Sequence, residues 1–238
     1  MKNQYVGDIN DYRKYGLIKI ISNVFNEKTL FVWMLTKDDN NKNDGNFIKY
    51  LDIPQKYRQY NTTLFDELKI IVENKTKNDN IENILLVENS RFFKKYKSFN
   101  KILNDKKEYR DKYFNDVYKL SKNYDLIFFD PDNGIEIKTC KRGNKNSSKY
   151  IFWEEAEKFY NMGKSILIYQ HYPRIKREKF HIEIEEKCIS KLIGPKVLLI
   201  KTPNTLFILI KKSKEGLNKQ INILKDELNI WKGEIAIV

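Results

Sequence analysis

The amino-acid sequence predicts an α/β fold, in which a mostly parallel sheet is covered by helices on both faces and ends in a C-terminal antiparallel hairpin strand. Short apolar runs alternate with segments of helical periodicity, as expected for parallel strands joined by crossovers. Near the C-terminus, two apolar runs flank Lys201–Asn204, which is a hairpin signal. No internal repeat or linker interrupts the 238 residues, so residues 1–238 are expected to form a single domain.

The expected elements follow one another along the whole chain. Apolar residues at three- and four-residue spacing favour helices at 11–25, 62–75, 108–123, 152–163, 178–194 and 216–231. Short runs of branched and aromatic residues favour strands at 29–36, 83–90, 125–130, 164–170 and, for the hairpin, within 196–212. Polar stretches at 37–46 and 138–149 are expected to be loops. The basic aromatic segment 91–103 suits either an amphipathic helix or contact with nucleic acid.

The charge balance indicates the partner class. Lys and Arg total 45 against 32 Asp and Glu, a formal charge of +13 that would attract polyanions, so nucleic acid is the expected partner. The alternative is a Lys- and Asn-rich composition that makes ordinary proteins basic. No apolar run approaches the roughly 18 residues of a membrane span, and two isolated cysteines favour reduced thiols. We therefore expect no membrane partner and a cytoplasmic location; the sequence leaves the oligomeric state unknown.

Polar side chains gather where the expected strands end. In parallel sheets the carboxyl ends of the strands meet at one edge, where ligands bind. The turn Asp130-Pro131-Asp132-Asn133 follows the apolar run DLIFF, and either closes a stiff turn or belongs to an active site. The candidate residues at the strand ends are Thr36, Asp39, Glu88, Asp130, Asp132, Asn133, Tyr169, Gln170, His171, Tyr172 and Arg174.

A second polar cluster precedes the first expected helix. Asp8, Asp11, Tyr12 and Lys14 are too polar and too close together to be explained by a helix start alone, although capping by Asp11 is the alternative. We expect Lys14 to point into the same pocket as the strand-end residues.

These features together resemble a known family. The order of elements, the acidic strand end at Glu88, the D-P-x-x strand end at Asp130 and the final hairpin resemble the Rossmann-like S-adenosylmethionine-dependent methyltransferases. Within them, DPDN is similar to the DPPY signature of the adenine-N6 class. The segment YRKYGLIKII, residues 12–21, resembles the N-terminal motif of that class, in which a Lys precedes a helix beside the cofactor.

The resemblance implies roles for the candidate residues. Asp130 would accept a hydrogen bond from the exocyclic amine of adenine, and Pro131 would position a backbone carbonyl for a second one. The catalytic set would be Asp130, Asp132, Asn133 and His171; S-adenosylmethionine would contact Asp8, Lys14, Thr36, Asp39 and Glu88; the substrate would contact Asp11, Tyr12, Tyr169, Gln170, Tyr172 and Arg174.

The sequence departs from the family pattern at two places. The cofactor loop is degenerate, because TKDDNNKNDGN offers only Gly45 where the family is glycine-rich. Asn133 replaces the aromatic residue that stacks on the base, a face that Tyr169 or Tyr172 could supply instead.

Two other functions fit the same residues. Asp39, Glu88, Asp130 and Asp132 could hold Mg²⁺, with His171 or Lys14 handling protons or charge in a metal-dependent nuclease or phosphodiesterase. The chain could also be a non-catalytic nucleic-acid-binding protein on a degenerate methyltransferase fold.

Overall fold

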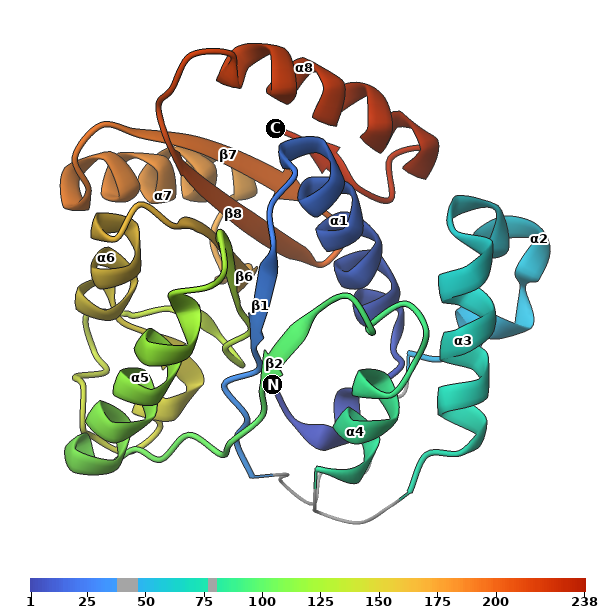
Figure 1. Ribbon diagram of the computed structural model, residues 1–238, viewed down its shortest axis with the longest axis horizontal. Helices are drawn as coiled ribbons and strands as arrows, with labels where there is room; N and C mark the ends of the chain where they lie inside the picture. The colour runs from blue at the N-terminus through green and yellow to red at the C-terminus, as the bar shows by residue number, and fades with distance from the viewer. Residues whose placement is uncertain (38–46, 77–80) are drawn as a thin grey trace.

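The computed structural model describes residues 1–37, 47–76 and 81–238, and it has an α/β, Rossmann-like fold (Figure 1). A seven-stranded sheet has the order β2-β1-β3-β6-β8-β7-β9. The strands are β1 (Thr29–Val32), β2 (Lys97–Phe99), β3 (Leu126–Phe129), β6 (Ser165–His171), β7 (Pro195–Lys201), β8 (Thr205–Lys212) and β9 (Ala236–Ile237).

The sheet is parallel on one side and mixed on the other. Strands β2, β1, β3 and β6 pair in parallel, whereas β8 is antiparallel to both of its neighbours, β6 and β7. Strand β9 pairs antiparallel with β7 and closes the edge. The predicted C-terminal antiparallel hairpin is therefore confirmed, and its second strand lies inside the sheet, between two strands that run the other way.

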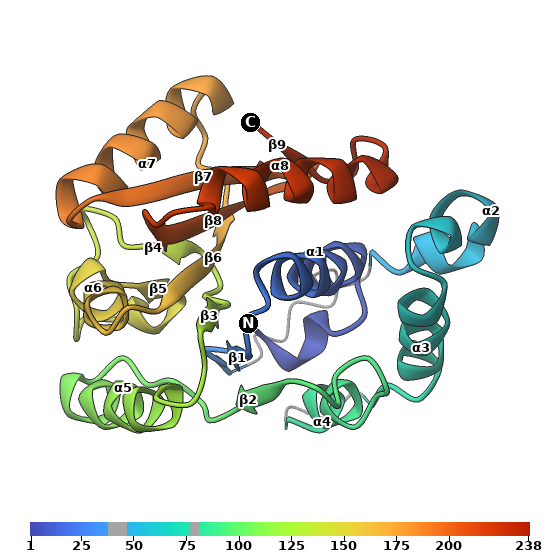
Figure 2. The same ribbon diagram turned by 45° about the horizontal axis from the view of Figure 1, so that its top comes forward.

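Helices cover both faces of the sheet, as predicted (Figure 2). The helices packed on one face are α1 (Ile9–Phe25), α3 (Thr62–Glu73), α4 (Glu82–Glu88) and α8 (Leu217–Leu228), and those on the other are α5 (Lys107–Ser121), α6 (Trp153–Asn161) and α7 (Arg177–Lys191). The short helix α2 (Pro54–Tyr57) precedes α3. None of the helices in the described ranges is long and apolar enough to cross a membrane.

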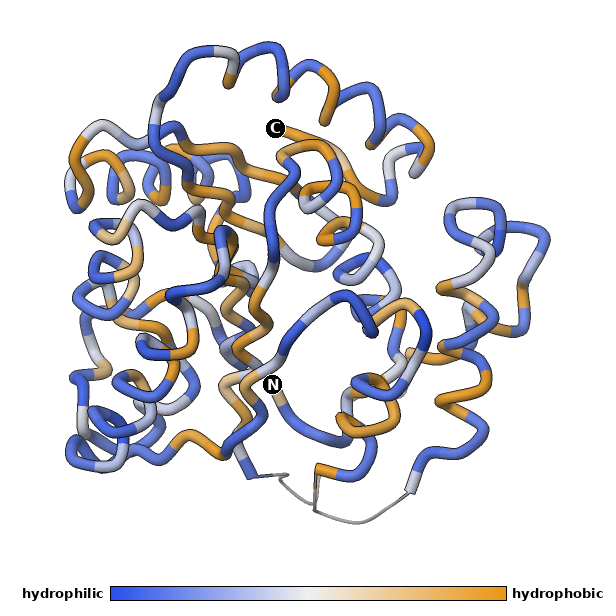
Figure 3. Tube along the Cα trace, in the orientation of Figure 1, coloured by the Kyte–Doolittle hydropathy of each residue, from blue (hydrophilic) through white to orange (hydrophobic). Residues whose placement is uncertain are grey.

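Alternation along the strands builds a separate core for each helical layer. In β1, Phe31 packs with the α1 side, while Leu30 and Val32 pack with the α5 side, and all three are fully buried. The hydropathy trace shows these apolar strands inside more polar helices (Figure 3). Strands buried on both faces explain why the runs are continuously apolar in sequence.

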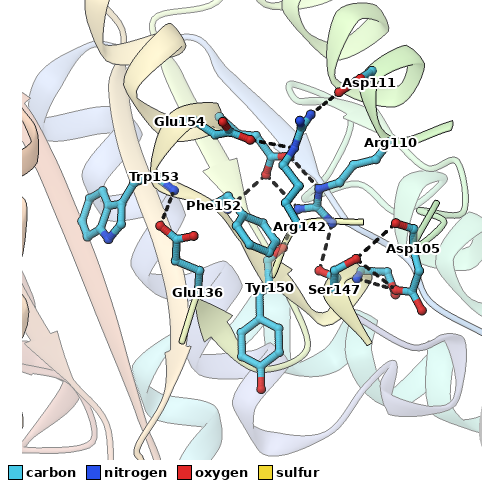
Figure 4. A network of polar contacts seen from close by, with 12 residues as sticks. Asp105, Arg110, Asp111, Glu136, Arg142, Ser147, Tyr150, Phe152, Trp153 and Glu154 are labelled. Atoms are coloured by element: carbon cyan, nitrogen blue, oxygen red, sulfur yellow. Dashed lines mark hydrogen bonds and ion pairs between the residues drawn. The ribbon is translucent and has the colours of Figure 1, made fainter. Parts of the chain in front are cut away.

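A buried arginine fixes the segment after β3 that contains β4 and β5. Two short parallel strands, β4 (Gly134–Ile135) and β5 (Tyr150–Ile151), form a separate small sheet. Arg110 of α5 binds both carboxylate oxygens of Glu155 at 2.6 and 2.8 Å, and donates to the carbonyls of Ser147 at 2.9 Å and Tyr150 at 2.7 Å (Figure 4). Arg142 adds ion pairs to Asp111 and Glu154. The loop is thereby fixed to helices α5 and α6.

One predicted strand is wrong. Residues 83–90 were expected to be a strand, but Glu82–Glu88 form helix α4, in which Ile84 and Val87, three residues apart, are fully buried. The sheet instead takes its edge strand β2 from Lys97–Phe99, inside the basic aromatic segment. A short apolar run without clear alternation does not distinguish a strand from a buried helix.

Candidate functional site

A cavity of about 310 Å³ opens at the carboxyl edge of the parallel strands. The N-terminal segment and the start of α1 form one wall, and the segment that follows β3 and the end of β6 form the other. The lining residues are Met1, Lys2, Tyr5, Asp8, Asn10, Asp11, Lys14, Phe47, Asp130, Pro131, Asp132, Asn133, Lys149, Tyr169 and His171.

Lys14 joins the two walls of this pocket. Its Nζ lies 2.7 Å from Asp130 Oδ2 and 2.9 Å from Asp11 Oδ1, and all three side chains are buried. The same ammonium lies 4.9 Å from the centre of the Tyr169 ring, within cation–π range. Asp11 is oriented further by the backbone N–H of Gly7, which donates to its Oδ2 at 2.9 Å.

Charge pairing and burial have opposite effects on the pKa values of Lys14 and Asp130. Burial acts to lower the pKa of Lys14, but Asp11 and Asp130 outweigh it and the pKa is raised. Burial raises the pKa of Asp130, and Lys14 only partly offsets that effect. The lysine therefore stays charged, and Asp130 is a buried acid whose pKa is raised although it is paired with an ammonium.

Asp8 begins helix α1 and lines the pocket. Its Oδ1 accepts hydrogen bonds from the backbone N–H groups of Asn10 at 2.8 Å and Asp11 at 3.0 Å, which is an N-cap. Burial, followed by the neighbouring charge of Asp11, raises the pKa of Asp8 to about 7. The cap is thus an acid that titrates near neutral pH.

Asp132 is held in its charged form. Its Oδ2 accepts a hydrogen bond from Thr36 Oγ1 at 2.5 Å, and its Oδ1 lies 2.8 Å from the amino group of Met1. Burial would raise the pKa of Asp132, but these two partners lower it overall. Asp130 and Asp132 therefore sit in different electrostatic settings within one turn.

Gln170 fixes the turn that carries both aspartates. Its Oε1 accepts from the N–H of Ile135 at 2.8 Å, and its Nε2 donates to the carbonyl of Asn133 at 3.1 Å. A Cβ on Gly134, where φ is +117°, would lie 2.2 Å from Gln170 Oε1. Gly134 is therefore required both by its backbone angle and by the close approach of the amide.

Tyr169 and His171 end β6 at the pocket. Their rings meet edge to face with centroids 5.2 Å apart, and the backbone N–H of His171 donates to the carbonyl of Asn133. Burial lowers the pKa of His171, and Asp132 partly opposes that effect. The lowered pKa favours the neutral imidazole, which is the form that can accept a proton.

The structure brings eight predicted residues to this pocket. They are Asp8, Asp11, Lys14, Asp130, Asp132, Asn133, Tyr169 and His171. Thr36 does not line the pocket, but its hydroxyl donates a hydrogen bond to Asp132, which does. Asp39 lies outside the described residues.

Besides Thr36, five predicted residues in the described ranges are not among those that line the pocket. Gln170 bonds the backbone of Asn133 and Ile135 and so supports the turn after β3. Tyr12 bonds the carbonyl of Tyr57 at 2.8 Å and the N–H of Asn61 at 3.0 Å, so it anchors α1 to the α2–α3 region. Tyr172 bonds His181 at 3.0 Å, and Arg174 is exposed.

Glu88 is the fifth. It ends helix α4, and its carboxylate accepts from Trp33 Nε1 at 3.0 Å and Asn100 Nδ2 at 2.9 Å. The expectation that Glu88 faces the pocket is therefore wrong, because its segment is not the strand that was predicted. In the described ranges, no group of three or more His, Cys, Asp or Glu side chains is placed to hold a metal ion.

Sequence reasoning missed several lining residues. They are Lys2, Tyr5, Asn10, Phe47 and Lys149, together with Met1. Lys149 reaches the pocket because the N–H of Asn133 donates to its carbonyl at 2.9 Å, a contact between positions 16 residues apart. No local pattern in the sequence marks such a contact.

Comparisons of the chain with family models, with curated proteins and with solved structures find no match. The class of protein is therefore defined by its fold and pocket. It is an α/β Rossmann-like protein with a charged, partly aromatic pocket at the carboxyl edge of its parallel strands.

Proposed function

We propose that the protein acts on nucleic acid as an adenine-directed methyltransferase, or as a close derivative that keeps the base pocket of one. The observation that carries the proposal is the Asp130–Asn133 turn, which follows β3 and lines the pocket. The Rossmann-like sheet with its terminal antiparallel hairpin supports the same assignment, since these were features of the resemblance.

The pocket has the groups needed to recognise an amine-bearing base. Lys14 bonds Oδ2 of Asp130, and Oδ1 of the same carboxylate is the acceptor that we assign to an exocyclic amine. Tyr169 supplies an aromatic surface where Asn133 replaces the stacking residue of the family. His171 is the group that we assign to moving a proton.

The segment after β1 differs from the methyl-donor loop of the family. The resemblance implies a glycine-rich loop after β1, but Trp33, Met34 and Leu35 are buried there. The N–H of Thr36 already donates to the carbonyl of Met1 at 3.0 Å, and residues 38–46 lie outside the described ranges. Residues 33–36 therefore do not fit such a loop, and among the described residues we assign contact with the donor to the wall that includes Asp8 and Asn10.

The net charge supports a polyanionic substrate. The formal charge of +13 favours phosphate contacts through counterion release, independent of sequence. The pocket is lined by four aspartates and three lysines, so its own charges nearly balance and most of the net positive charge lies elsewhere. Base recognition and backbone affinity are thus separable by mutation.

The test combines calorimetry with a transfer assay. Purified protein is titrated with S-adenosylmethionine, and transfer of a labelled methyl group to single- and double-stranded DNA and RNA is measured. We expect Asp130→Asn to lower transfer at least about 100-fold, because it removes the charge that orients the amine. Nucleic-acid binding at about 50 mM salt should be retained, because the phosphate contacts lie outside the pocket.

Asp125→Asn is the matched control, because Asp125 precedes the same strand at its opposite end and is exposed. Equal losses in the two variants would contradict the role of Asp130. Absence of both S-adenosylmethionine binding and nucleic-acid binding would overturn the proposal. Nucleic-acid binding without transfer, but with Mg²⁺-dependent cleavage, would favour the nuclease alternative.

A further inference from the structure

A second cavity lies on the outer side of α1, and it shares no lining residue with the first. Its volume is about 280 Å³. It is bounded by α1, the start of α3 and the segment that leads into β2. The lining residues are Tyr15, Lys19, Asn61, Thr63, Leu64, Arg91, Phe92, Lys95 and Tyr96.

The lining carries three cations and no acidic residue. Within the described part of the chain, Lys19, Arg91 and Lys95 form no ion pair, and Lys95 only bonds the side-chain oxygen of Asn23 at 3.1 Å. Burial, together with the charge of Lys19, lowers the pKa of Lys95. Glu67 lies nearby, since its Oε2 accepts from the backbone N–H of Phe92 at 3.0 Å, and the three cations outnumber this carboxylate. The excess positive charge favours an anionic ligand.

Aromatic side chains make up much of the remaining wall. The rings of Tyr15 and Phe92 lie 5.1 Å apart, and Lys95 lies 5.2 Å from the centre of the Tyr96 ring. Asn61 and Thr63 add polar side chains. Cations beside aromatic faces are the groups that contact a phosphate and an adjacent base.

We propose that this cavity binds one nucleotide unit, with its phosphate at Lys19, Arg91 and Lys95 and its base against Phe92 and Tyr96. The inference rests on the proposed function for the class of partner. Helix α1 links the two sites, because Lys14 lies in the first and Lys19, five residues later, in the second. At about 1.5 Å per residue, the two positions are about 7.5 Å apart along the helix axis.

The test measures binding of labelled single-stranded oligonucleotides of DNA and RNA, and of AMP, by fluorescence and calorimetry at about 50 and 200 mM salt. The triple variant Lys19→Gln, Arg91→Gln, Lys95→Gln should weaken binding at least tenfold and flatten its salt dependence. Phe92→Leu should weaken binding severalfold with the salt dependence unchanged, because it removes stacking and no charge. Circular dichroism checks that each variant is folded.

The matched control is Lys187→Gln, Lys219→Gln, Lys225→Gln, which removes the same charge from exposed positions on α7 and α8. Equal weakening in the two triple variants would overturn the proposal, because it would show a general charge effect. Loss of AMP binding in the cavity variant identifies a mononucleotide site, and loss of oligonucleotide binding alone identifies a unit within a strand. Failure of the proposed function is recognised separately, since Asp130→Asn tests the other pocket.

Discussion

Lys14 is the residue on which the first pocket depends most. It is a buried cation between two buried carboxylates, Asp11 and Asp130, so its removal leaves two charges without compensation. We expect Lys14→Met to lower the free energy of unfolding at pH 7 by about 3–5 kcal/mol, measured by urea denaturation. The loss should shrink as the pH falls, because the pKa of Asp130 is raised by burial and protonation of Asp130 removes one of the two uncompensated charges.

Lys19→Met, five residues further along α1, is the control. Lys19 forms no ion pair within the described ranges, so its replacement should change the free energy of unfolding by no more than about 0.5 kcal/mol. Similar losses in the two variants would show that the ion pairs of Lys14 contribute little to stability.

Asp8 gives a pH dependence with a defined sign. Its pKa in the folded protein is raised to about 7, so the folded state holds a proton that the unfolded chain releases near pH 4. The stability that this proton contributes is complete below about pH 4 and is lost as the pH rises to about 7. Asp8→Asn keeps an N-cap and removes the titration.

The difference in unfolding free energy between Asp8→Asn and the wild type should therefore grow between pH 4 and 7, to at most about 4 kcal/mol, and stay constant above that range. Denaturation curves at half-unit pH intervals measure it. Parallel pH profiles for the two proteins would contradict the raised pKa of Asp8.

The sequence identified site residues where neighbouring positions in the chain mark them, at a helix start or at a strand end. Asp11, Lys14 and Asp130 were singled out because polar groups at a helix start and at a strand end converge in this type of sheet. Tyr12 was expected to contact the substrate, but it does not line the pocket. It bonds Tyr57 and Asn61 instead, and these partners are more than 40 residues away in the sequence. A side chain's partners across the fold are not encoded in its neighbours.

At the scale of the element, the turn after β3 depends on a glycine and an amide. In Gly134→Ala, the backbone angle costs about 1–2 kcal/mol and the collision with Gln170 a further 1–3 kcal/mol. Gly163→Ala should show only the first cost, because Gly163 also has positive φ but an added Cβ would meet nothing within 4 Å. Calorimetric unfolding of both variants gives the comparison, and equal losses would show that the turn relaxes freely.

Arg110 tests how the loop between β4 and β5 is held. Arg110→Met leaves Glu155 buried without its main partner and frees the carbonyls of Ser147 and Tyr150. We expect faster amide hydrogen exchange in residues 141–149 and a loss of about 3–5 kcal/mol in unfolding free energy. The double variant Arg110→Met, Glu155→Met should recover part of the stability but not the slow exchange. Unchanged exchange in 141–149 would show that other contacts hold the loop.

Elements were predictable where the sequence shows a helical stripe over several turns or an apolar run bounded by polar residues. The stripes gave helices α1, α3, α5, α6, α7 and α8, and the apolar runs gave strands β1, β3, β6, β7 and β8. Helix α4 was not predicted, because its seven residues are too few to separate a period of 3.6 from a continuous apolar run. The strand β2 has only three residues, too short for a pattern.

At the scale of the whole molecule, the strand order could not be derived from the sequence. The alternation of elements indicated a parallel sheet with a terminal hairpin, and both features are present. The position of β8 between β6 and β7 depends on which apolar faces pack together, and pairing partners are chosen by the assembled core. The hydrogen bond between Trp33 and Glu88 likewise depends on how the assembled core brings distant segments together.

The place of β8 has a consequence for synthesis on the ribosome. Strands β6 and β7 emerge first, but they are joined in the sheet only through Thr205–Lys212, which emerges later. Until those residues leave the exit tunnel, β6 has an open, apolar edge, and such edges promote aggregation of nascent chains. The last third of the sheet therefore has to assemble after most of the polypeptide has been made, and a translational pause before residue 205 would prolong the vulnerable stage.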